Sequence, residues 1–133
     1  MGMEQAVSFA GRPIPAWPAV SDLLIQRGFP VEVRMIDGEL TFPDEVPPPT
    51  WRELRLGTPG GMVTLRREFD RVVFVTWGNA NEPLLQAWNA LTWAFAQAGE
   101  GKVLSPNGPL SAADFLHTAN LPPSLRLQQE QRE

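Results

Sequence analysis

Residues 31–42 read VEVRMIDGELTF, and this stretch predicts a β-hairpin. Apolar and polar residues alternate on both sides of Asp37-Gly38, a dipeptide that two-residue type I′ turns prefer because both central positions need a positive φ. With that turn, Ile36 lies opposite Glu39. One face of the hairpin then collects four apolar side chains, which are Val33, Met35, Leu40 and Phe42. We expect this face to pack on the core of a sheet.

A second hairpin is predicted after the extended linker formed by the three prolines at residues 47–49. Residues 51–57 and 62–69 flank the sequence TPGG, whose Pro-Gly pair suits the centre of a tight turn. In this register Leu54 lies opposite Leu65, Leu56 opposite Val63, and Glu53 opposite Arg66. Residues 72–77 read VVFVTW, and their four consecutive apolar side chains predict a central strand with both faces covered.

A long helix is expected at residues 82–98, opened by Asn79 or Asn81 as cap and closed by glycine. Its core-facing stripe consists of Leu84, Trp88, Leu91, Phe95 and Ala98. No charged residue lies between Pro83 and Gly99. The opposite side therefore carries only Trp93 with amides and alanines, and its candidate interface residues are Gln86, Asn89, Ala90, Trp93 and Gln97. Either another part of the same chain or a second subunit covers this side.

These elements predict an α+β fold with an antiparallel sheet of four to five strands. The sheet contains two consecutive hairpins plus the central strand, the long helix packs on one face, and short helices near residues 18–27 and 111–119 flank it. Residues 18–121 form the single domain. Residues 1–17 are expected to lie along the surface as an arm anchored by Ile14 and Trp17, and residues 122–133 to form a polar tail.

The composition of the 133 residues excludes several chemistries. The absence of cysteine rules out disulfides, thiol nucleophiles and thiolate metal sites, and a single histidine rules out a paired-histidine metal site. We therefore expect no cofactor and no metal. No secretory signal or membrane-spanning apolar run is recognisable, so we expect a cytoplasmic location. Ten of the 11 basic residues are arginine, a bias typical of a GC-rich bacterial genome.

Three functions remain, and the first is a non-catalytic interaction module, self-associating as a homodimer, that uses the Trp93 side of the helix or the open side of the sheet. The second is nucleic-acid binding through the arginines of the second hairpin, with Trp51 and Trp77 nearby as a stacking platform for single-stranded bases. These arginines are Arg52, Arg55, Arg66, Arg67 and Arg71. A net charge of −4 and a pI near 5.0 weigh against nucleic-acid binding. The third is a small hydrolase or lyase in which Asp114 orients His117 as a general base.

Overall fold

The structure is a computed structural model that describes residues 2–42 and 45–125. Its elements in chain order are β1 (Gly2–Ser8), α1 (Trp17–Gln26), β2 (Glu32–Ile36), β3 (Glu39–Leu40), β4 (Glu53–Thr58), β5 (Gly61–Glu68), β6 (Arg71–Trp77), α2 (Glu82–Gly99), β7 (Lys102–Ser105), β8 (Gly108–Leu110) and α3 (Ala112–Thr118).

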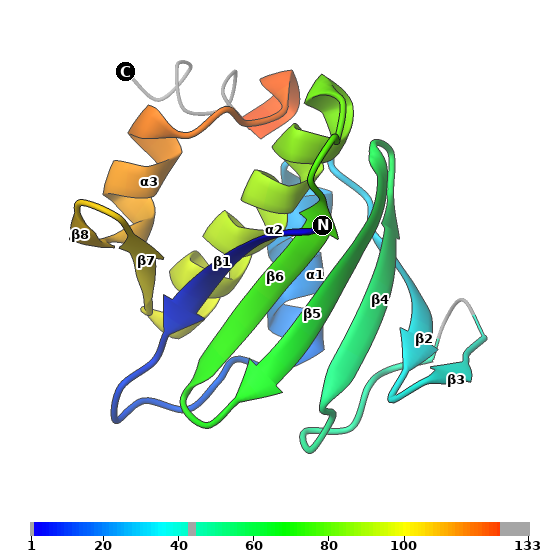
Figure 1. Ribbon diagram of the computed structural model, residues 1–133. Coiled ribbons are helices and arrows are strands. Elements are labelled where there is room, and N and C mark those ends of the chain that lie inside the picture. The colour runs from blue at the N-terminus through cyan, green and yellow to red at the C-terminus, as the bar shows by residue number, and fades with distance from the viewer. Residues whose placement is uncertain (1, 43–44, 126–133) are drawn as a thin grey trace.

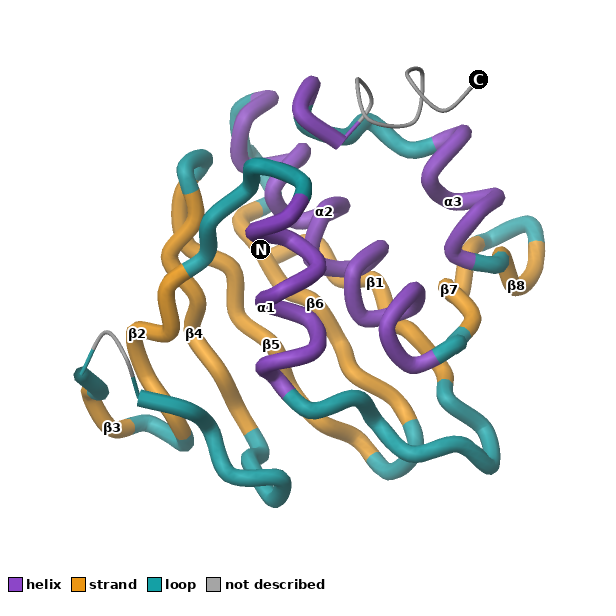
Figure 2. The backbone as a smooth tube through the Cα atoms, turned by 180° about the vertical axis from the view of Figure 1, so that it is seen from behind, coloured by secondary structure: helices purple, strands orange, loops and turns teal. Residues whose placement is uncertain are grey.

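The fold is α+β, with one antiparallel sheet and the helices on one side of it (Figure 1). The strand order is β3-β2-β4-β5-β6-β1-β7-β8. Seen from behind, α1 and α2 cross the back of the sheet, and α3 lies beside them near β7 and β8 (Figure 2). The other side of the sheet is left without a covering helix, and it is the surface that faces the viewer in Figure 1.

Both predicted hairpins are present in the predicted register. Asp37 and Gly38 have φ angles of 50° and 86°, as their turn requires, and Ile36 pairs with Glu39. The second hairpin pairs Leu54 with Leu65, Leu56 with Val63 and Glu53 with Arg66. Local turn chemistry and side-chain alternation were therefore sufficient to position these four strands against their partners.

The expected core-facing side of the first hairpin is wrong in part. Val33 is buried, but Leu40 and Phe42 are exposed, and β3 is only two residues long. The reason is an irregularity in the pairing of β2 with β4 between Val33 and Met35, which reverses the side-chain alternation beyond it. Ile36 packs against the core instead of Met35.

The N-terminal segment is not a surface arm. Gly2–Ser8 forms β1, which lies inside the sheet between β6 and β7. Gln5 on this strand interrupts the apolar alternation, yet its side chain faces α2 and donates hydrogen bonds of 2.9 Å to both Asn89 Oδ1 and Thr92 Oγ1. The expected anchor Trp17 is buried.

With β1, β7 and β8 the sheet has eight strands rather than four to five. Residues beyond the expected domain boundary also contribute to the core, since Leu125 is fully buried within the predicted tail. Residues 126–133 of that tail lie outside the described part of the chain.

Helix α2 carries the centre of the core. Asn81 caps it by accepting a hydrogen bond from the Leu84 N–H at 3.2 Å. Phe95 makes edge-to-face contacts with Trp51 and Phe74, with ring centroids 6.4 and 5.4 Å apart. Within the described ranges, no helix is long and apolar enough to cross a membrane.

Candidate functional site

The uncovered side of the sheet, called here the open face, is formed by alternate residues of its four middle strands. The β5–β6 pairing sets Thr64 beside Val75 and Arg66 beside Val73. The pairing of β6 with β1 adds Glu4 and Ala6, and that of β4 with β5 adds Glu53 and Arg55. In full, the open face comprises Gly2, Glu4, Ala6 and Ser8 on β1, Glu53, Arg55 and Gly57 on β4, Met62, Thr64, Arg66 and Glu68 on β5, and Arg71, Val73, Val75 and Trp77 on β6.

A groove of about 430 Å³ lies at one end of the open face. Two large apolar side chains line it, Trp77 with 68% of its surface exposed and Met62 with 43%. Val75, Thr64 and Arg55 also line it. Among the described residues, no ion-pair partner is found for Arg55. The groove therefore combines exposed apolar surface with a cation that is available to a partner.

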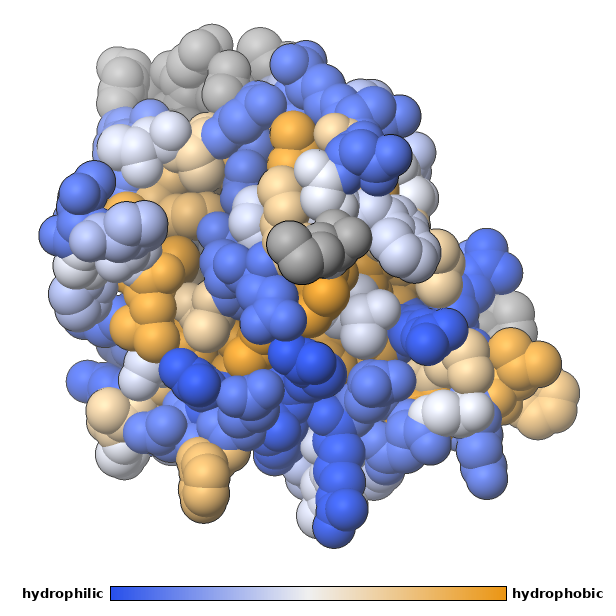
Figure 3. Space-filling view, viewed as in Figure 1, coloured by the Kyte–Doolittle hydropathy of each residue, from blue (hydrophilic) through white to orange (hydrophobic). Residues whose placement is uncertain are grey.

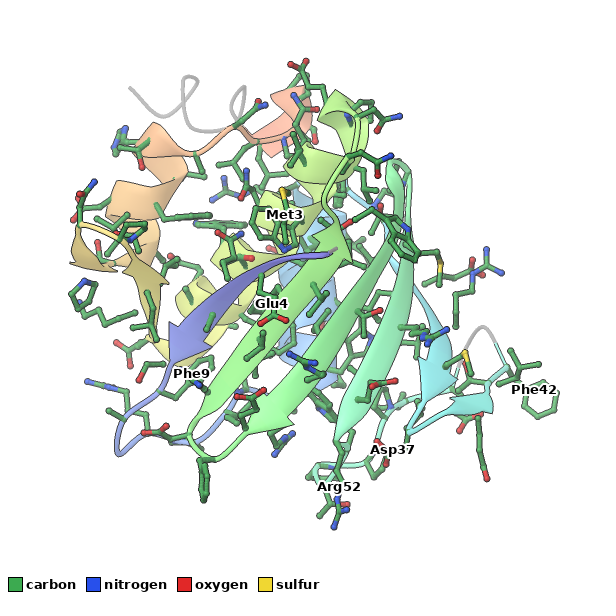
Figure 4. All side chains as sticks on the ribbon, in the orientation of Figure 1. Met3, Glu4, Phe9, Asp37, Phe42 and Arg52 are labelled. Carbon is green, nitrogen blue, oxygen red and sulfur yellow. The ribbon has the colours of Figure 1, made fainter. Side chains whose placement is uncertain are left out.

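Charged side chains occupy the rest of the open face, where Figure 3 shows hydrophilic residues gathered over the lower half of the sheet. Arg66 on β5 pairs with Glu4 on β1 at 3.2 Å, so this ion pair crosses over the intervening strand β6. Figure 4 shows Glu4 over the middle of the sheet. A second pair joins Arg71 to Glu68 at 3.2 Å. Val73 is buried on this face although no helix covers it, because charged side chains lie over β6.

The five arginines proposed for nucleic-acid binding do not form one patch. Arg55 and Arg66 share the open face, as predicted, but Arg66 and Arg71 are held in ion pairs with glutamates. Arg67 lies over the ring of Trp51 at 4.6 Å, and burial lowers the pKa of its guanidinium. Arg52 points away from the lower end of the sheet (Figure 4).

Trp51 was the proposed stacking platform for nucleic-acid bases, and it is buried. A base therefore has no access to its ring, whereas Trp77, the other tryptophan of that hypothesis, is exposed.

The Trp93 side of α2 is covered by the same chain, which is one of the two alternatives raised by the sequence. Trp93 has 1% of its surface exposed, Ala90 is fully buried, and the guanidinium of Arg27 lies 5.0 Å from the Trp93 ring centroid. Gln86 and Asn89 donate side-chain hydrogen bonds to Asn120, at 3.2 and 2.9 Å.

Gln97 is the exposed member of the five candidate interface residues. The Trp93 side of α2 therefore lacks charged residues where it packs against other parts of the same chain.

The possible catalytic pair lies on the short helix α3. His117 and Asp114 are exposed, and Ser111 caps the helix by accepting a hydrogen bond from the Asp114 N–H at 3.2 Å. Neither residue lines the open-face groove or the cavities beside α1. Over the described ranges no cluster of three histidine, aspartate or glutamate residues is suited to hold a metal.

The sequence did not single out the groove at Trp77 and Met62. The run of apolar residues in β6 suggested that both faces of this strand were covered by other elements, but covering helices lie on one side only. The available signal was that Met62 and Arg55 share a side in the predicted register of the second hairpin. Trp77 could not be added to that side, because the turn at Phe69-Asp70 left the register of residues 72–77 open.

Comparison with known protein families, with curated protein sequences and with solved structures finds no match to this chain.

Proposed function

We propose that this protein is a non-catalytic interaction module that self-associates as a homodimer through the open face of its sheet. The observation that carries the proposal is the exposure of Trp77 and Met62 side by side in a groove on that face. Tryptophan and methionine are enriched at protein interfaces. A two-fold dimer needs only one such self-complementary surface.

The edges of the sheet offer a poorer surface for association. An exposed edge strand associates through its unpaired backbone groups, and short strands or prolines suppress this. At one edge β3 has two residues, and at the other β8 has three, with Pro109 in the middle. Neither edge strand is therefore suited to pairing with another chain. The open face between the two edges remains as the extended surface for association.

The test is the molar mass of the purified chain by size-exclusion chromatography with light scattering. We expect about twice 14.7 kDa for the native chain at high micromolar concentration, and a single-chain mass for Trp77→Glu. Phe42→Ser is the matched control, because Phe42 is also an exposed aromatic side chain but lies on the β2–β3 hairpin and points away from the molecule (Figure 4). A native chain that stays at 14.7 kDa throughout would contradict the proposal.

Tryptophan fluorescence gives a second measurement. Trp17, Trp51 and Trp93 are buried and Trp88 is half-buried, so Trp77 is the exposed one of the five. Dilution of a dimer that covers Trp77 should shift the emission to longer wavelength and increase quenching by iodide. Emission that does not depend on concentration would place Trp77 outside any contact between copies.

A further inference from the structure

We propose that the two copies pack face to face about a two-fold axis that runs parallel to the strands, between β5 and β6. In this arrangement Arg55 of each copy pairs with Glu4 of the other. The inference rests on the proposed function, since it specifies the partner surface for the same open face. It follows from the order in which side chains succeed one another across the four middle strands.

One row across the sheet carries opposite charges at its two ends. The register sets Arg55 on β4 beside Thr64 on β5, then Val75 on β6 and Glu4 on β1. An axis between β5 and β6 exchanges the two halves of this row when a second copy is laid on it. Each Arg55 then faces the Glu4 of the other copy, while Thr64 and Val75 meet in the middle. The symmetry produces this ion pair twice.

The neighbouring row that contains Met62 and Trp77 agrees with the same axis. Met62 lies beside Gly57, and Trp77 lies beside Gly2, so the next row has two large apolar side chains between glycines. The axis places Trp77 of one copy on Met62 of the other. The row on the other side adds no charge pair, because the axis sets Arg66 against Val73 and Glu53 against Ala6. Along the other end of β5 and β6, Glu68 pairs across the strands with Arg71. The axis therefore sets the Glu68 of each copy against the Arg71 of the other, again with opposite charges facing.

Both members of the central pair can take part. Arg55 has no ion-pair partner among the residues described, and Glu4 contacts Arg66 through one carboxylate oxygen, Oε2. A carboxylate has two oxygens and can accept from a second guanidinium. The strands β4 and β1 lie about 7 Å from the axis. The usual angle of about 30° between packed sheets displaces the pair by about 4 Å along the strands, which these long side chains can span.

An axis across the strands is the competing arrangement. When it passes through the row of Arg55 and Glu4, each of these residues meets its own copy, which brings like charges together. When the axis passes midway between the row of Arg55 and the row of Glu53, Arg55 faces Glu53 of the other copy. This second geometry sets Met62 against Glu68 and Trp77 against Arg71, so neither exposed apolar side chain gains an apolar partner. The axis parallel to the strands packs Trp77 on Met62 and is favoured for that reason. The choice between Glu4 and Glu53 as the partner of Arg55 separates the two arrangements.

Charge reversal tests the pairing. Arg55→Glu alone puts two glutamates at both symmetric contacts, and Glu4→Arg alone puts two arginines there. We expect each variant to weaken self-association by about tenfold or more at low salt. When the two variants are mixed, both contacts again join a glutamate to an arginine. The mixture should therefore form a heterodimer with nearly native affinity, detected with one variant fluorescently labelled. Glu4→Arg also removes the Glu4–Arg66 ion pair within its own chain. That loss is present both in the variant alone and in the mixture, so it cannot explain a recovery of affinity on mixing.

The matched control is a mixture of labelled Arg55→Glu with Glu53→Arg, in which the labelled chain should not regain native affinity, because one of its two contacts still sets a glutamate against Glu4. Glu53→Arg alone should associate like the native chain, since it keeps both Arg55–Glu4 contacts. If this control forms the heterodimer and the first mixture does not, the axis runs across the strands and the inference is overturned. If neither mixture associates while Trp77→Glu still abolishes the native dimer, the inference fails but the proposed function stands. If Trp77→Glu has the mass of a native dimer, the open face is not the contact, and the proposed function fails as well.

Discussion

The hydrogen bonds of Gln5 are predicted to hold β1 against α2, and the substitution Gln5→Ala measures their contribution. The side-chain amide donates to Asn89 Oδ1 and Thr92 Oγ1, both at 2.9 Å. Each such bond contributes about 1 kcal/mol net. Thr92 is fully buried, so loss of the donor also leaves its oxygen poorly satisfied. We expect the free energy of unfolding to fall by about 2–3 kcal/mol.

The assay is thermal unfolding followed by circular dichroism, at a concentration fixed for all variants because self-association also affects the melting temperature. A loss of this size corresponds to a melting temperature lower by about 8–12 °C in a chain of this length. Gln97→Ala is the matched control, since Gln97 is an exposed glutamine on α2, the helix that Gln5 contacts. Its effect on the free energy of unfolding should stay within about 0.5 kcal/mol. A Gln5→Ala variant as stable as the control would refute the reasoning and leave the docking of β1 to its backbone pairing alone.

Three further predictions concern the turns. Gly60→Ala should lower the free energy of unfolding by about 2 kcal/mol or more in urea titrations, because a Cβ there would collide with the backbone carbonyl of Pro83 at the start of α2. Phe69→Asn should raise the melting temperature, with a gain of about 1 kcal/mol, since Phe69 is fully exposed at a φ of 55° that asparagine tolerates better; an unchanged melting temperature would exclude strain at this turn. Hydrogen bonds from the backbone N–H groups of Glu53 and the residue before it lower the pKa of Asp37 below 3.8. The Asp37 carboxylate therefore stabilises the fold fully at pH values above 3.8, and this stabilisation is lost as the pH falls through the lowered pKa. The difference in free energy of unfolding between the native chain and Asp37→Asn should shrink on acidification. A difference that does not depend on pH would contradict the role of these hydrogen bonds.

What the sequence alone determined about this protein was the local part of the fold. The turn Asp37-Gly38 and the Pro59-Gly60 turn lie within a few residues of the strands that they join, so turn chemistry and side-chain alternation specify the pairing. The capping asparagine and the apolar stripe specified α2 for the same reason. The open face was predicted only as a possible surface, because the sequence does not show which side of a strand another element covers.

Tertiary structure decided the features that depend on distant contacts. β1 joins the sheet by pairing with β6 and β7, and its Gln5 side chain hydrogen-bonds to α2 more than 80 residues away. Trp93 is buried, with the guanidinium of the distant Arg27 over its ring. Trp77 is exposed because all the helices lie behind the sheet. Alternation and composition identify the side chains that can be buried or bind a partner. Whether a given side chain is buried or exposed depends on which other element packs against it. Packing between segments far apart in the chain determines this, and a sequence pattern within one segment does not show it.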